Sequence, residues 1–332
     1  MDSSAGGRQL APAGAIAAAS LLLIVAIGIA VSLGAVRLSP DRLIGGLFDT
    51  GDAAARQIVW HLRLPRVLVA ALVGANLSLA GVLLQGVTRN PLAGPHVLGL
   101  SAGAGFAAIT VVVIAPGAPV ELAAPAAFAG AIAAALVVYG LAWRGGISPV
   151  RFALSGVATA ALFAALSTAV LASSDLFTQS VLSFLAGGLF SRDWDDVRQI
   201  FPYTLVIGGA AVVVGGTLNV LALGDDIARS LGMRVERTRL FLVVLAAGLA
   251  GSAVAVSGML AFVGLVMPHV ARLIVGNDNR VIAPLAALLG ASLLVFADTF
   301  ARLVIAPAEI PVGIVTAVIG APVFLLLIRT RT

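Results

Sequence analysis

The sequence predicts an all-α membrane protein, and three observations support this fold class. The chain has 332 residues, of which 60% are hydrophobic, and its mean hydropathy of +1.10 implies more apolar surface than a water-soluble domain needs. Its apolar segments are long and continuous rather than alternating with period two, which indicates helices rather than a β-barrel. The 37 glycines suit backbones that pack closely in lipid. We therefore predict that residues 1–332 form a single polytopic transmembrane domain.

About ten transmembrane helices are predicted from apolar runs near the length that crosses the hydrocarbon layer. They lie near residues 14–36, 62–88, 96–115, 123–142, 152–172, 200–222, 240–257, 262–274, 281–303 and 313–328. The first run is longer than the core of a signal peptide, so we expect it to be retained as a helix. The eighth is short and contains Pro268.

The distribution of arginine predicts the orientation, because positive residues concentrate on the cytoplasmic side. With the N-terminus inside, the inner segments hold 12 of the 20 arginines and 5 of the 15 acidic residues. An even number of crossings then places both termini in the cytoplasm. This pattern also explains the net charge of +5 better than nucleic-acid binding does.

The side chains that are missing exclude several classes of chemistry. All 20 basic residues are arginine, so the chain cannot form a P-loop or a Schiff base, both of which need lysine. It contains no cysteine, and His61, His96 and His269 are far apart without the spacing of metal ligands. We expect no metal site, no cofactor and no catalytic residues, and therefore no enzyme activity in this chain.

Residues 223–239 form a polar stretch between two long apolar runs. The stretch holds four arginines and three acidic residues in a chain that is only 11% charged. Asp225 and Asp226 suit a helix N-terminus, Ile227 and Leu231 share a helical face, and Gly232 suits a helix end. We expect two short cytoplasmic helices that receive force from a soluble partner. An arginine-rich loop that only fixes the topology is an equally good interpretation of this stretch alone.

Three other connecting segments carry local signals. Residues 37–61 and 173–198 lie outside in the predicted topology and are long enough to form surface helices facing an external partner, or they are simple connectors. Asn90-Pro91-Leu92-Ala93 predicts a turn on the inner side, near residues 223–239. It either contacts the partner or serves only as a turn.

A series of motifs gives the chain a resemblance to a known family. The first half contains Arg63-Leu64-Pro65-Arg66, Gly74-Ala75, Ala80 to Gln85, Asn90 to Pro95 and Leu98 to Ala104. The second half contains Gly224-Asp225 with Ala228 and Leu231-Gly232, Phe262 to His269, Ala297-Asp298 with Arg302, Glu309 to Gly313, and Gly320 to Phe324. This ordered set resembles the FecCD-type ABC importer permeases, which carry ferric siderophores, heme or cobalamin.

The resemblance implies an assembly of several subunits in the cytoplasmic membrane of a bacterium. Two permease subunits, identical or related, would pair around a central path. Two cytoplasmic ATP-binding subunits would hydrolyse ATP, and an extracytoplasmic binding protein, periplasmic or lipid-anchored, would deliver the cargo. The family's coupling helices match residues 223–239, and the residues implied in ATPase coupling are Gly224, Asp225, Ala228, Arg229, Leu231, Gly232 and Arg234.

The resemblance also implies docking and path residues. Arg63, Arg66 and Arg302 match arginines that meet acidic residues of the binding protein, where ion pairs set the register of docking. Snorkelling, or an Asp298–Arg302 pair within one helix, explains these arginines without docking. Ser155, Gly156 and Thr159 lie on the fifth helix, which the family places along the path, although small residues also indicate close helix packing.

The sequence thus predicts an ATP-driven permease that imports an iron chelate by alternating access, in particular a ferric siderophore. Residues Ser257 to Phe262 depart from the Gly-Pro-Ile-Gly form of the heme and cobalamin branches, which remain the alternative within the family. His269 matches a family histidine that occurs without heme cargo, so we do not assign it as a heme ligand. An ion-coupled secondary transporter is disfavoured, because Asp298 is the only acidic residue well inside an apolar run.

Overall fold

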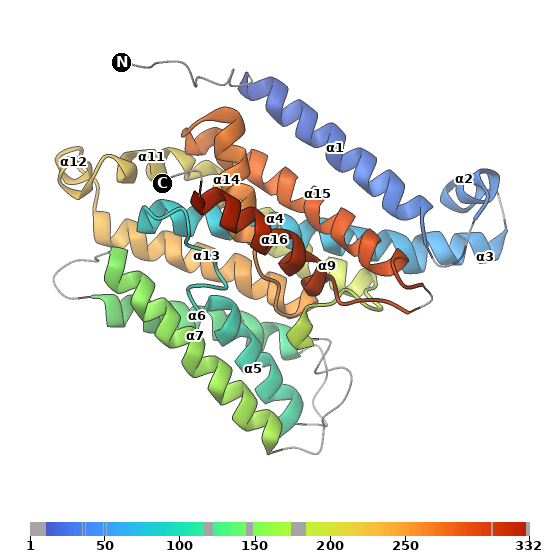
Figure 1. Ribbon diagram of the computed structural model, residues 1–332, viewed down its shortest axis with the longest axis horizontal. Coiled ribbons are helices and arrows are strands. Elements are labelled where there is room, and N and C mark those ends of the chain that lie inside the picture. The colour runs from blue at the N-terminus through green and yellow to red at the C-terminus, as the bar shows by residue number, and fades with distance from the viewer. Residues whose placement is uncertain are drawn as a thin grey trace.

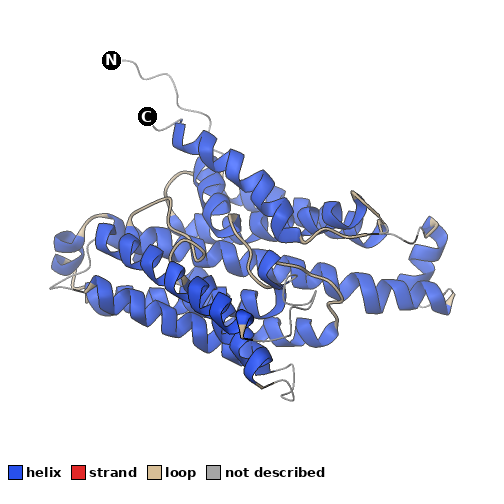
Figure 2. Ribbon diagram, turned by 60° about the horizontal axis from the view of Figure 1, so that its bottom comes forward, coloured by secondary structure: helices blue, strands red, loops and turns tan. Residues whose placement is uncertain are grey.

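The computed structural model shows a helical bundle that extends along one axis (Figures 1 and 2). The structure describes residues 11–34, 36, 38–48, 50, 52–115, 122–143, 149–173, 184–306 and 308–329. Within these ranges the regular elements are helices, with no β-strand. Both chain termini and residues 174–183 of the predicted outer segment 173–198 lie outside the described residues, so the placement of the termini in the cytoplasm stays a prediction.

The elements follow one another as a series of apolar helices and short linking helices. In order they are α1 (Pro12–Ser32), α2 (Pro40–Phe48), α3 (Ala53–Arg56), the π-helix η1 (Gln57–Arg63), α4 (Leu64–Thr88), α5 (Leu100–Ile114), α6 (Ala123–Ala142), α7 (Pro149–Ala172), α9 (Trp194–Tyr203), the π-helix η3 (Thr204–Gly208), α10 (Gly209–Val213), α11 (Gly215–Ala222), α12 (Asp225–Ser230), α13 (Val235–Ser257), α14 (Val263–Val275), α15 (Asn279–Leu303) and α16 (Val312–Arg329).

Each of the ten predicted membrane segments contains helical structure, but not each is long enough to cross a bilayer. Six helices in the described part of the chain have the length and composition of a span, and the bent pair Trp194–Val213 and Gly215–Ala222 makes a seventh. The predicted third, eighth and tenth segments are the shorter apolar helices Leu100–Ile114, Val263–Val275 and Val312–Leu326. A 13-residue helix rises about 20 Å, less than the ~30 Å hydrocarbon core. The chain is therefore a multi-pass helical membrane protein, and ten crossings stay a prediction.

Several predicted boundaries differ from the observed ones. The second helix begins well before residue 62, because α3, η1 and α4 form one continuous helix from Ala53 to Thr88. The third begins at Leu100 rather than 96, after a turn in which Gly99 has a φ of 77°. The sixth contains a π-helix and a 42° bend between Val213 and Gly215. Apolar runs do not predict these features, because they depend on local turns and tertiary contacts.

The core of the bundle is α4, with α13 and α15 against it (Figure 1). In the most apolar window of the helix that ends with α4, 78% of the residues are buried, against 22% for α7. Glycines let these helices meet closely: a Cβ on Gly81 would lie 1.7 Å from the carbonyl oxygen of Gly264, and one on Gly74 would lie 2.2 Å from that of Gly290. Small residues therefore set the distances between α4, α14 and α15.

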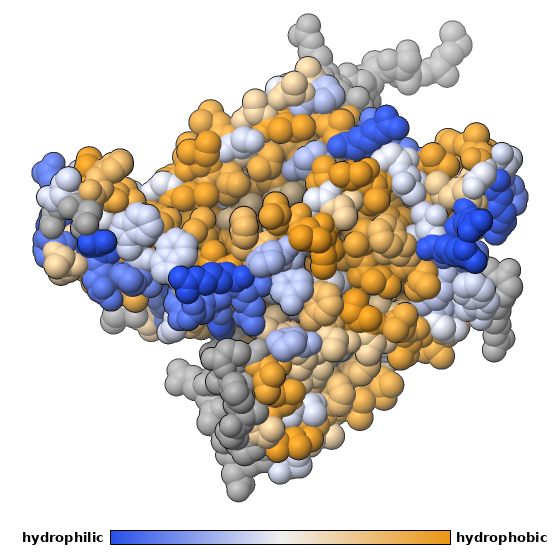
Figure 3. Space-filling model, turned by 180° about the vertical axis from the view of Figure 1, so that it is seen from behind, coloured by the Kyte–Doolittle hydropathy of each residue, from blue (hydrophilic) through white to orange (hydrophobic). Residues whose placement is uncertain are grey.

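The surface matches a protein that lies in a membrane. Seen from behind, it is mostly apolar in its middle, and hydrophilic residues gather chiefly toward the two ends of the long axis (Figure 3). One end carries α12, and the opposite end carries α2 and α3 (Figure 1). We call them the α12 end and the α2 end.

Candidate functional site

The polar stretch 223–239 lies at the α12 end and contains one separate helix, not two. Gly224, with a φ of 112°, precedes α12, and Gly232, with a φ of 83°, follows it. Both glycines thus occupy backbone conformations that other residues rarely adopt. The predicted second short helix is instead the first part of α13, which begins at Val235. It continues directly into a span, because no breaking residue separates Arg239 from the apolar run that follows.

Asp225 anchors α12 to two long helices. Its carboxylate accepts hydrogen bonds from Arg239 of α13, from Nη1 at 2.9 Å and from Nη2 at 2.7 Å, and it pairs with Arg89 at the end of α4. Arg89 Nε also donates to the carbonyl oxygen of Leu221 at 2.8 Å. Burial raises the pKa of Asp225, but its hydrogen bonds and charge contacts with Arg239 and Arg89 outweigh this effect and lower the pKa below 3.8. The carboxylate is therefore ionised at neutral pH and holds α12 in place.

The other face of α12 is exposed. Ala228 is fully buried, whereas Ile227 is 49% exposed and Leu231 is 63% exposed. Arg229 and Arg234 are exposed as well, and Arg229 Nη1 lies 3.3 Å from Asp226. The predicted coupling residues thus divide into an anchored group, Asp225 and Ala228, and an exposed group, Arg229, Leu231 and Arg234. Leu231 and the neighbouring Ile227 thus form an exposed apolar surface, which Arg229 and Arg234 flank.

The Asn90-Pro91 turn lies beside this segment, as predicted. Arg89 ends α4 in a left-handed conformation with a φ of 49°, and Asn90 Oδ1 accepts from the Leu92 amide at 2.9 Å. Because Arg89 contacts both Leu221 and Asp225, the turn is joined directly to α12.

A buried charge cluster, the Arg66 cluster, joins α4 to α15 and to the turn after it. It consists of Arg66, Asp298, Arg302 and Glu309. Arg66 donates to Asp298 from Nη2 at 2.8 Å and from Nε at 3.0 Å, and its Nη1 donates to Glu309 at 2.9 Å. Arg302 Nε lies 3.2 Å from Asp298, one helical turn away. The Asp298–Arg302 pair is the alternative to docking that the sequence predicts, whereas no sequence pattern indicates that Arg66 and Glu309 complete the cluster.

The three predicted docking arginines point into the molecule. Arg63, Arg66 and Arg302 are 4%, 9% and 6% exposed. Arg63 Nη1 donates to the carbonyl oxygens of Val31 and Ser32 at 2.7 and 2.9 Å, and Arg302 Nη2 donates to that of Ala30 at 3.2 Å. These carbonyl groups are at the C-terminal end of α1, where the helix leaves its acceptors unsatisfied. Two of the arginines therefore hold α1 in place.

The predicted path residues on α7 differ in how deeply they are buried. Thr159 is 2% exposed, and a Cβ on Gly156 would lie 2.7 Å from Leu98 Cδ2, so Gly156 packs against the turn before α5. Ser155 is half-buried, next to the exposed Leu154. The described part of α7 also exposes Val157 and Leu162. The exposed face of α7, rather than Gly156 or Thr159, is thus available to a path or a partner.

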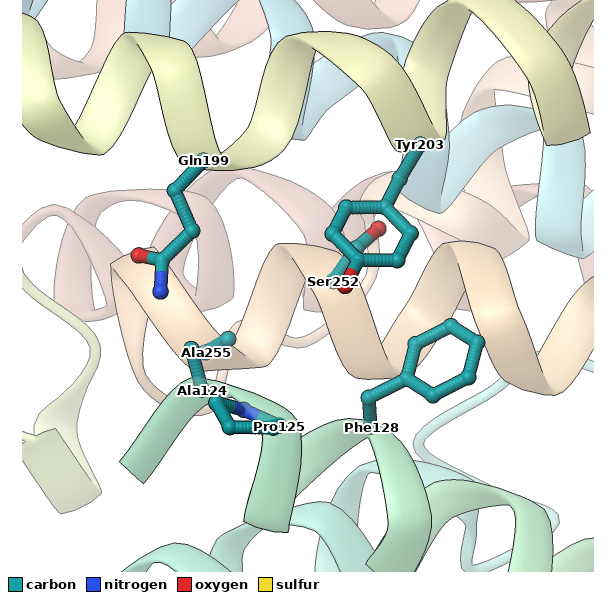
Figure 4. A pocket seen from close by; sticks show the side chains of 7 residues that line it. All are labelled: Ala124, Pro125, Phe128, Gln199, Tyr203, Ser252 and Ala255. Atoms are coloured by element: carbon teal, nitrogen blue, oxygen red, sulfur yellow. The ribbon is translucent and has the colours of Figure 1, made fainter. Parts of the chain in front are cut away.

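One pocket lies between α6, α9 and α13 (Figure 4). Gln199 and Tyr203 extend toward it from one side, with Phe128 and Ser252 on the others. Its volume of about 30 Å³ is close to that of a single water molecule, which is far too small for a metal chelate. The described residues also contain no group of three or more side chains that could hold a metal ion. This pocket is therefore not a cargo site.

This arrangement is a multi-pass helical bundle with an anchored helix at one end, and comparison with known proteins gives its class. A family model described as "FecCD transport family" matches residues 22–330. A solved structure titled "An inward-facing conformation of a putative metal-chelate type ABC transporter" has a TM-score of 0.86 and 29% identity, and covers 96% of this chain and 99% of that one. The chain is thus an ABC importer permease. It belongs to the FecCD transport family.

Curated relatives match along nearly the whole chain. The Fe(3+)-citrate import system permease protein YfmE of Bacillus subtilis is 39% identical, covering 97% of this chain and 96% of the relative. The ferric enterobactin transport system permease protein FepD of Escherichia coli is 40% identical, covering 94% of each chain. The cobalamin import system permease protein BtuC of Halobacterium salinarum is 41% identical, covering 83% of this chain and 74% of the relative.

Proposed function

We propose that this chain imports an iron chelate, in particular a ferric siderophore, across the cytoplasmic membrane of a bacterium. The observation that supports this cargo is the set of names among its relatives. They include permeases for Fe(3+)-citrate, Fe(3+)-hydroxamate, achromobactin and ferric enterobactin, which are 36–40% identical to this chain. The chain itself performs no chemistry, and two separate ATP-binding subunits supply the energy.

In this proposal, α12 is the docking point for an ATP-binding subunit. Leu231 and Ile227 supply exposed apolar surface, while Arg229 and Arg234 supply charge around it. Buried apolar side chains at the centre of an interface carry much of its affinity, and surrounding charges set its orientation. Because Asp225 ties α12 to α4 and α13, a push on α12 reaches two helices of the core.

At the α2 end, we propose that a binding protein docks over Arg63, Arg66 and Arg302. Their guanidinium groups are engaged within the chain, so an acidic residue of the binding protein has to compete with an internal partner. Of the two acidic partners of Arg66, Glu309 is the more accessible. Its side chain is 29% exposed, whereas that of Asp298 is 2% exposed. Docking would then exchange Glu309 for a carboxylate of the binding protein.

A second permease subunit, the same chain or a related one, would complete the path. The exposed face of α7 beside Ser155 supports this, because the pocket between α6, α9 and α13 within one chain is far too small for a chelate. Cargo would then move between two subunits rather than through one.

Cobalamin is the second candidate cargo, favoured by the 41% identity to a cobalamin permease. Ion-coupled transport finds less support. Asp298, the acidic residue within α15, is paired with both Arg66 and Arg302, so it serves as an internal counter-charge rather than lying open along a route for ions.

The test is uptake into proteoliposomes that hold this permease with its ATP-binding subunits and binding protein. We expect ATP-dependent accumulation of radiolabelled iron presented as a ferric siderophore, and none when the ATP-binding subunits are omitted. Uptake of cobalamin without iron would select the second candidate. Accumulation driven by a proton or sodium gradient without ATP would overturn the proposal.

A further inference from the structure

Asn219 joins the segment that carries α12 to the first residues of α15. Its Oδ1 accepts hydrogen bonds from both the backbone amide and the side-chain Nδ2 of Asn279, each at 2.9 Å. Its Nδ2 donates to Asp278 Oδ1 at 2.6 Å. Both polar atoms of the Asn219 side-chain amide are therefore paired with the N-terminus of α15.

Asp278 also caps the helix that it begins. Its side chain accepts from the Arg280 amide at 3.0 Å, which satisfies one of the free N–H groups at the start of α15. Asn279 is 7% exposed. Asn219 thus binds to a helix terminus that is already fixed, rather than to a flexible loop.

The backbones of α11 and α15 also meet closely at this point. A Cβ on Gly215 would lie 2.7 Å from the carbonyl oxygen of Asn279, and one on Gly216 would lie 3.0 Å from Arg280 Nε. Because α11 is followed directly by Gly224 and α12, its attachment to α15 also fixes the position of α12.

At its other end, α15 carries Asp298 and Arg302 of the Arg66 cluster. The helix has 25 residues and rises about 36 Å, so it links the α12 end to the charge cluster in a single rigid element. Arg302 also contacts α1, and Asp298 binds Arg66 of α4. A displacement of α15 would therefore alter both contacts.

We infer that Asn219 is a positioning residue for coupling, which locks the α12-bearing segment to α15 so that the two move as one unit. This inference rests on the proposed function, because it assumes that an ATP-binding subunit acts on α12. The lock makes α15 the route by which the ATP-binding subunits and a partner at the α2 end influence each other.

The experiment measures ATPase activity of the full complex in proteoliposomes, with and without its binding protein. We expect N219A and N219D to reduce the stimulation by the binding protein about fivefold or more, because N219D sets two carboxylates against each other. The double variant N219D/D278N exchanges amide and carboxylate, and it should recover the stimulation. Asparagine caps a helix as well as aspartate does, so D278N keeps the N-cap.

N277D is the matched control, because it makes the same substitution at an exposed neighbour, and it should keep full stimulation. Basal ATPase activity of the complex should stay near that of the wild type in all variants. Full stimulation in both Asn219 variants, or no recovery in the double variant, would contradict the inferred role of Asn219. A wild-type complex without any stimulation would instead count against the proposed function itself.

Discussion

At the scale of single residues, Asp298 supplies a negative charge to two buried arginines, so its removal should destabilise the folded protein. Asp298 is 1% exposed and contacts both Arg66 and Arg302. We expect D298N to lower the free energy of unfolding by about 3–5 kcal/mol, because it leaves buried positive charges without a counter-charge. The change in Tm of the purified permease in detergent measures this effect.

E309Q provides the comparison for this prediction. Glu309 pairs with the same Arg66, but it lies nearer to the surface, so its removal should cost about 1 kcal/mol or less. Equal losses for the two variants would show that burial does not govern the cluster.

Asp225 gives a prediction about pH. Its pKa is lowered in the folded protein, so its contribution to stability is present above its ordinary pKa of 3.8 and is lost as the pH falls through the lowered value. The Tm difference between wild type and D225N should therefore stay constant from about pH 8 to pH 5, and it should shrink below about pH 4. A difference that persists unchanged in acid would mean that the ion pairs with Arg239 and Arg89 do not stabilise α12.

At the scale of the elements, the close approach of α4 and α14 leaves no room for a side chain at Gly81. We expect G81A to lower the free energy of unfolding by about 1–3 kcal/mol, because its methyl group forces the two helices apart. G140A is the matched control, since a Cβ on Gly140 of α6 meets nothing within 4 Å. In a Tm comparison, a loss in G140A as large as that in G81A would indicate a backbone effect rather than a steric one.

The elements also show how far the sequence could be used to predict this structure. The apolar runs located all ten helical segments, because burial in lipid requires a continuous apolar stretch. They did not locate the π-helices or the early start at Ala53, which are not encoded in hydropathy. The Arg66–Asp298 pair joins residues that are 232 positions apart, and the sequence alone does not specify such a contact. The assignment of Gly156 and Thr159 to the path comes from the family resemblance and stays a prediction. In the structure Gly156 packs against Leu98 and Thr159 is buried.

At the scale of the whole molecule, the exposed face of α12 predicts where a substitution would separate the permease from its ATP-binding subunits. L231D places a charge at the centre of the proposed apolar contact, so we expect it to abolish co-purification of the ATP-binding subunits while leaving the Tm of the permease unchanged. I44D, which makes the same kind of change on α2 at the opposite end, should leave co-purification intact. Retention of the ATP-binding subunits by L231D would place their docking site elsewhere.

The helix α4 is bonded at both of its ends, by Arg66 near its start and by Arg89 just after its last residue. A screw rotation or an axial slip of this helix alone would disrupt ion pairs at both ends of the molecule simultaneously. Transport movements should therefore carry α4 together with α12, α13 and α15 as one unit, and the lightly buried α7 should move relative to it. Distances between reporters on α4 and α15 should then stay constant throughout the cycle.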